Sequence, residues 1–161
     1  HTTEGLFDNF FGTVGGGRRA ALKFVVWQNA RVLIAATLLG TFSFGVAPLI
    51  LTPIVYAILG YVMSQFVVAG FDLTVFAAAL LPHGIVEIPV IILATAVAFR
   101  IGAVMTKPPA GETVGFAWTV TLGDTLKLWV TLVIPGLLIA GVLEVFLTPL
   151  VVASVASSFG G

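Results

Sequence analysis

Four long apolar stretches alternate with short breaks of glycine, proline and polar residues along this chain. Each stretch has about 20 residues or more, the length that a helix needs to cross the hydrocarbon core of a bilayer. The pattern predicts spans over residues 24–46, 49–69, 82–105 and 128–152. We therefore expect an all-α fold, a polytopic transmembrane helix bundle of about four spans that forms a single domain over residues 24–155.

Shorter segments complete the expected organisation. Residues 1–23 are a glycine-rich lead-in that we expect at the membrane surface, and residues 156–161 are a small polar tail. Because proline suits the first turn of a helix, Pro82 predicts a helix start, with residues 74–81 forming a short re-entrant helix before it. Residues 112–127 mix apolar and charged side chains, which predicts an amphipathic helix lying on the membrane.

The composition agrees with a membrane protein and excludes several other classes. Hydrophobic residues make up 59% of the chain and charged residues 9%, whereas about a quarter of the residues of a soluble domain are charged. Seven basic and seven acidic residues cancel, so nothing indicates a nucleic-acid partner. The absence of cysteine excludes disulfides, iron–sulfur clusters and thiolate zinc sites.

Ionisable and amide side chains interrupt the apolar spans. His83 and Glu87 are four residues apart and therefore share one face of a helix. Counting a rise of about 1.5 Å per residue from the ends of antiparallel spans places such residues of all four spans in one leaflet. We predict a buried polar cluster there, made of Asn29, Arg31, Gln65, His83, Glu87 and Glu144.

Two interpretations of this cluster stay open at this stage. In the first, Arg31 pairs with Glu87 or Glu144, and the network fixes which helices are neighbours. In the second, His83, Glu87 and Glu144 bind a divalent metal in a membrane-embedded hydrolase, or titrate in an ion-coupled transporter. The metal set is weaker than an HExxH motif, and Arg31 would oppose a dication. We therefore favour the first interpretation and assign no catalytic residue and no cofactor.

Three short motifs say more about the protein family than the composition of the chain does. They are PHGIVEIPVIILA at the start of the third span, Asn-Ala-Arg at the entry to the first span, and IAGVLEVFLTP in the fourth. Together they resemble the stage II sporulation protein M family over residues 24–152. The resemblance points to Asn29, Pro82, His83, Gly84, Glu87, Pro89, Glu144, Thr148 and Pro149.

The resemblance implies an integral membrane protein of a bacterium or archaeon, with no established enzymatic activity. In spore formers, the namesake of the family helps to localise a peptidoglycan-degrading complex at the engulfing membrane, and many relatives occur in organisms that do not sporulate. We expect a multi-pass scaffold in the cell membrane whose partners are the lipid bilayer and other membrane or envelope proteins. Small residues such as Gly40, Gly45 and Gly60 also favour a homo-oligomer.

Overall fold

The computed structural model describes residues 17–70 and 72–159, which form helices joined by short turns. The elements are α2 (Gly17–Phe42), α3 (Val46–Val68), α4 (Leu73–Thr106), α5 (Val114–Leu128), the π-helical turn η1 (Trp129–Val133), α6 (Ile134–Val142), the π-helical turn η2 (Leu143–Leu147) and α7 (Thr148–Phe159). In this part of the chain, four helical rods are long and apolar enough to cross a membrane. The predicted all-α bundle with four spans is confirmed.

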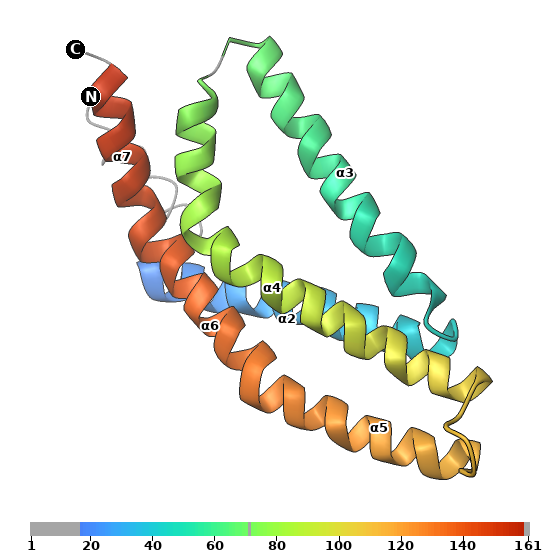
Figure 1. The fold of residues 1–161 in the computed structure, drawn as a ribbon. Coiled ribbons are helices and arrows are strands. Elements are labelled where there is room, and N and C mark those ends of the chain that lie inside the picture. The colour runs from blue at the N-terminus through green and yellow to red at the C-terminus, as the bar shows by residue number, and fades with distance from the viewer. Residues whose placement is uncertain (1–16, 71, 160–161) are drawn as a thin grey trace.

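Helix α4 is the centre of the bundle, because every other helix of the described part packs against it. Figure 1 shows α2 lying behind α4. The rod of α5, α6 and α7 runs along α4, and its α6 segment packs against α2 as well. Buried apolar residues of α2, α4, η1 and α6 form one core: Leu33, Val90, Ala94, Val97, Trp129, Val133 and Leu137. The core therefore joins three of the four rods.

The expected short helix before Pro82 is not a separate element. Helix α4 begins at Leu73 and contains both Pro82 and Pro89. Proline lacks an amide hydrogen and collides with the carbonyl four residues earlier, so it bends a helix without always ending it. Figure 1 shows this bend in the first half of α4.

The start of α4 is fixed by a local hydrogen bond rather than by proline. The Asp72 carboxylate accepts a hydrogen bond from the backbone amide of Thr74 at 2.6 Å. Hydrogen bonding from Thr74 holds the pKa of Asp72 below its ordinary value, because it favours the ionised carboxylate. Asp72 therefore acts as the N-cap of α4.

The segment expected to lie on the membrane continues directly into the last span. Helix α5 passes through η1 into α6, and α6 passes through η2 into α7, so the rod is helical from Val114 to Phe159. An exposed ion pair between Arg100 and Asp124, 3.4 Å apart, ties α5 to the end of α4. The polar side chains of α5 thus face a neighbouring helix as well as the surroundings.

Each π-helical turn ends two residues before a proline. Turn η1 precedes Pro135, and η2 precedes Pro149. A turn with hydrogen bonds from i to i+5 is wider than an α-helical turn, and so it makes room for the proline ring and the missing amide hydrogen. The Thr148 hydroxyl donates to the carbonyl of Leu143 at 3.2 Å across the second turn.

Glycines allow α2 and α4 to approach closely at the end near the α2–α3 turn. A Cβ atom at Gly40 would lie 2.7 Å from the carbonyl oxygen of Ala98, and one at Gly102 would overlap backbone atoms of Gly40, Phe44 and Gly45. Two of the glycines that we expected to favour self-association, Gly40 and Gly45, are therefore used within the chain. A Cβ at the third, Gly60, would meet nothing within 4 Å, and the homo-oligomer stays a prediction.

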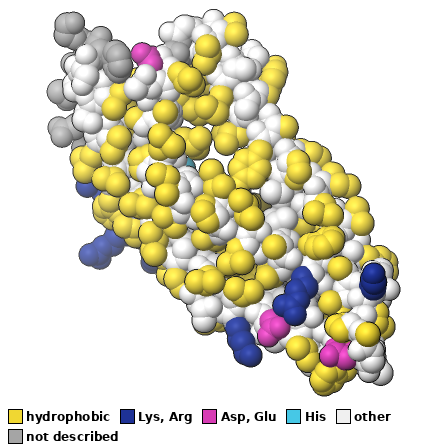
Figure 2. All heavy atoms as spheres, in the orientation of Figure 1, with side chains coloured by type: hydrophobic (Ala, Val, Ile, Leu, Met, Phe, Trp, Pro, Cys, Tyr) yellow, Lys and Arg dark blue, Asp and Glu magenta, His cyan; other side chains and the backbone are white. Residues whose placement is uncertain are grey.

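Helix α3 makes the loosest association with the bundle. Of its residues, all of which the structure describes, only Pro48 is buried. Figure 1 shows α3 diverging from α4 after the α2–α3 turn, and Figure 2 shows an opening between these two helices. The rings of Phe66 and Phe76, with centroids 5.6 Å apart, bring the far end of α3 back to α4.

Candidate functional site

The best-defined polar contact between spans joins α2 and α4. The side-chain amide of Asn29 donates a hydrogen bond to a carboxylate oxygen of Glu87 at 2.7 Å, and the contact is partly buried. These residues are 58 positions apart in sequence. Because the Asn29 amide is neutral, it bonds to the Glu87 carboxyl without adding a charged group to the membrane.

Glu87 lies where several helical segments meet. Three side chains are close enough to interact electrostatically with Glu87: His83 one turn earlier in α4, Glu144 in η2 and Tyr56 in α3. All four of these side chains are half-buried. One polar region, which consists of Asn29, Tyr56, His83, Glu87 and Glu144, is therefore shared by α2, α3, α4 and η2.

Two atoms of this region lack hydrogen-bond partners. The Nδ1 atom of His83 and the hydroxyl oxygen of Tyr56 are buried, and neither has a partner among the described residues. A polar group that is removed from water without a partner is costly, and more so at membrane depth. The region therefore has unused capacity for hydrogen bonds.

The predicted pairing of Arg31 with a buried carboxylate is wrong. Arg31 is exposed, and its guanidinium donates to the side-chain oxygen of Gln28 at 2.7 Å. Within residues 17–70 and 72–159, the one ion pair is between Arg100 and Asp124. Since Asn29 and Arg31 are two residues apart, they point about 200° apart around α2, and only Asn29 faces Glu87.

Gln65 also lies apart from this region. It is exposed, near the end of α3, and its side chain has no hydrogen bond to a described residue. The structure thus joins Asn29 to Glu87 directly, with His83 and Glu144 within electrostatic range, whereas Arg31 and Gln65 face elsewhere. The six-residue cluster as a functional unit stays a prediction.

The geometry gives no support to a metal centre built from His83, Glu87 and Glu144. In the part of the chain that the structure describes, no three histidine, aspartate or glutamate side chains are grouped so that they could hold a metal ion. A catalytic zinc site needs three protein ligands around one point. We therefore carry the metal interpretation no further.

The motif residues lie around the same polar region. Pro82 and Pro89 bracket the turns that carry His83 and Glu87, and the buried Gly84 lies between them. Thr148 and Pro149 directly follow η2, which holds Glu144. Both motifs thus bring a proline-altered stretch of helix and a carboxylate to the same part of the bundle.

A family model described as Stage II sporulation protein M matches residues 4–149. The chain belongs to the stage II sporulation protein M family. Comparison with curated proteins and with solved structures gives no match. In this family member, two of the motif residues, Asn29 and Glu87, form the hydrogen bond that joins α2 to α4.

Two features of this family member go beyond the sequence predictions. Tyr56 lies within the apolar span predicted over residues 49–69, and its spacing of four residues from Thr52 places both on one face of α3. Thr52 and Thr95 share a hydrogen bond of 3.0 Å between their hydroxyl groups, which joins α3 to α4 on that face. The second feature is the pair of π-helical turns, whose sequence signal is the proline that follows each one.

Proposed function

We propose that this member of the stage II sporulation protein M family is a multi-pass scaffold of the cell membrane that binds another membrane or envelope protein through α3. The observation that carries the proposal is the loose association of α3 with the rest of the bundle. A helix of 23 residues that buries a single proline leaves nearly its whole surface for other contacts. Helix association in membranes depends on packing and polar contacts, so such a surface can accept a partner helix.

An exposed polar group on α3 supports the same proposal. Gln65 exposes a side-chain amide near the end of this helix. Amide groups that hydrogen-bond across helices stabilise helix pairs in membranes by roughly 0.6–2 kcal/mol. The open position at Gly60 also lets a second backbone approach closely.

Site-specific photo-crosslinking in the membranes of the source organism tests this proposal. A photoreactive amino acid is placed at Ile58 or Gly60, which lie on opposite faces of α3, or at Leu138 on α6 as a control. Ile58 and Leu138 are both apolar and about half exposed, at 58% and 48%. We expect a discrete protein adduct from at least one α3 position and none from Leu138, identified by mass spectrometry.

The adduct's mass separates the outcomes. An adduct with a different protein supports the scaffold, and an adduct of twice the chain mass identifies α3 as a contact between copies instead. Lipid adducts alone at Ile58 and Gly60, equal to those at Leu138, would show that α3 faces only lipid and would overturn the proposal.

A further inference from the structure

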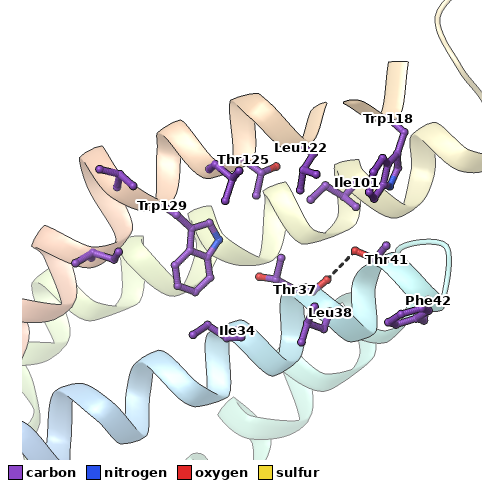
Figure 3. A pocket seen from close by; sticks show the side chains of 13 residues that line it. Ile34, Thr37, Leu38, Thr41, Phe42, Ile101, Trp118, Leu122, Thr125 and Trp129 are labelled. Carbon is purple, nitrogen blue, oxygen red and sulfur yellow. Dashed lines mark hydrogen bonds between the residues drawn. The ribbon is translucent and has the colours of Figure 1, made fainter. Parts of the chain in front are cut away.

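A groove with a volume of about 500 Å³ lies on the side of the bundle formed by α2, α4 and α5. Ile34 and Phe42 mark its extent along α2, and Ile101 of α4 lines it between the other two helices. Figure 3 shows Trp118 and Trp129 reaching from α5 and η1 toward α2. The groove contains none of the polar residues around Glu87.

The chemistry of the lining favours hydrocarbon over water. Its hydroxyl groups belong to threonines that already donate to carbonyls of their own helices: Thr37 to Leu33 at 2.8 Å, Thr41 to Thr37 at 3.2 Å and Thr125 to Thr121 at 2.8 Å. An ordered water needs two to four polar partners, and with these hydroxyl hydrogens engaged the lining has few to offer. An empty groove of this size would lose the dispersion contacts of its walls. In a membrane, apolar chains are the available filling.

The groove is elongated along the helices that form it. The lining extends from Ile34 to Phe42 on α2 and from Trp118 to Ile134 on the opposite rod, or roughly 12 Å and 24 Å at 1.5 Å per residue. Over that length the threonine hydroxyl hydrogens are already engaged, and the rest of the lining is apolar or aromatic, which suits an extended hydrocarbon chain.

We propose that this groove binds an acyl chain of a membrane lipid, with the ester end at Trp118 and the methyl end toward Ile134. Trp118 is on the second turn of α5, close to the polar loop that joins α4 and α5, and tryptophan favours the membrane interface. Its indole Nε1 is buried and has no acceptor among the described residues. The Ile134 end is apolar. This site is independent of α3 and of the proposed scaffold role.

Bromine quenching of tryptophan fluorescence tests the proposal. The probe is phosphatidylcholine with one dibrominated acyl chain, added to the full chain in micelles, with Trp27→Phe so that only Trp118 and Trp129 report. The test variant is Thr37→Phe, which narrows the groove because Thr37 lines it. The matched control is Thr131→Phe, because Thr131 also donates to the carbonyl four residues earlier but is exposed and outside the lining. Native mass spectrometry of the same samples counts bound lipids and copies of the chain.

We expect saturable quenching at about one lipid per chain in the Trp27→Phe protein and in the control. In Thr37→Phe, we expect apparent affinity to fall by about tenfold or more and the bound-lipid mass to disappear. Thr37→Leu provides a milder narrowing if Thr37→Phe unfolds, which circular dichroism reports. Equal quenching in the narrowed and control variants would show that lipid contacts only the outer surface. A mass of two chains without lipid would show that another copy fills the groove, and either result overturns the proposal.

Discussion

Replacing Gly102 with alanine is expected to destabilise the protein by about 3 kcal/mol or more, the upper end of the cost of overpacking. The added Cβ would overlap three backbone atoms, one each in Gly40, Phe44 and Gly45. Backbone atoms in a tight turn cannot move aside as the end of a side chain can. Gly45 has a φ of 86° and its amide donates to the Gly40 carbonyl at 2.7 Å, so the turn itself is constrained.

Thermal unfolding of detergent-purified protein, followed by fluorescence-detected size-exclusion chromatography, measures this effect. Gly115→Ala and Gly123→Ala are the controls, because a Cβ at either position meets nothing within 4 Å. Alanine is favoured over glycine in helices by about 1 kcal/mol, so these controls should melt at or above the wild-type temperature. A Gly102→Ala protein that melts together with them would contradict the close approach of α2 and α4.

The second large effect is expected from Asn29→Leu, which removes the donor to Glu87. The carboxylate would stay partly buried without its 2.7 Å hydrogen bond, and leaving such a group unsatisfied costs about 1–3 kcal/mol. Glu87→Leu removes the acceptor, and the double variant removes both. We therefore expect the double variant to be more stable than the sum of the two single losses predicts.

A double-mutant cycle of unfolding free energies in micelles measures this coupling, which averages about 0.6 kcal/mol and reaches about 1.7 kcal/mol for hydrogen bonds between membrane helices. Gln65→Leu is the matched control, since it also replaces an amide on a membrane-length helix but breaks no side-chain hydrogen bond in the described part. Strict additivity of Asn29→Leu and Glu87→Leu would mean that the bond does not stabilise the bundle.

Hydropathy was sufficient to predict the helical class and the number of membrane-length rods. A run of about 20 apolar residues has few alternatives to a helix in lipid, and four such rods are present. Their ends were harder to predict. Pro82 suggested a break, yet α4 continues through it. The helix expected over residues 112–127 is present as α5 and runs without interruption into the last rod, and its place on the membrane surface stays a prediction.

The side-chain partners could be predicted only in part. Depth along a helix places Asn29, Arg31 and Glu87 at a similar level, but depth contains no information about direction around the helix axis. The rotation of about 100° per residue in a helix separates Asn29 and Arg31 by about 200°, so they cannot share a face. The role of Gly102 could not be predicted, because a glycine in a span has the same sequence signature whether it touches another helix or lipid.

The two π-helical turns also affect how the sequences of this family are expected to align. Each contains one more residue than an α-helical turn would need for the same hydrogen-bond closure. A relative lacking one residue in 129–133 or 143–147 can therefore close that stretch as ordinary α-helix, with the flanking contacts to α4 unchanged. Single-residue gaps in alignments of this family are thus expected inside these helices, just before Pro135 and Pro149, and not only in loops.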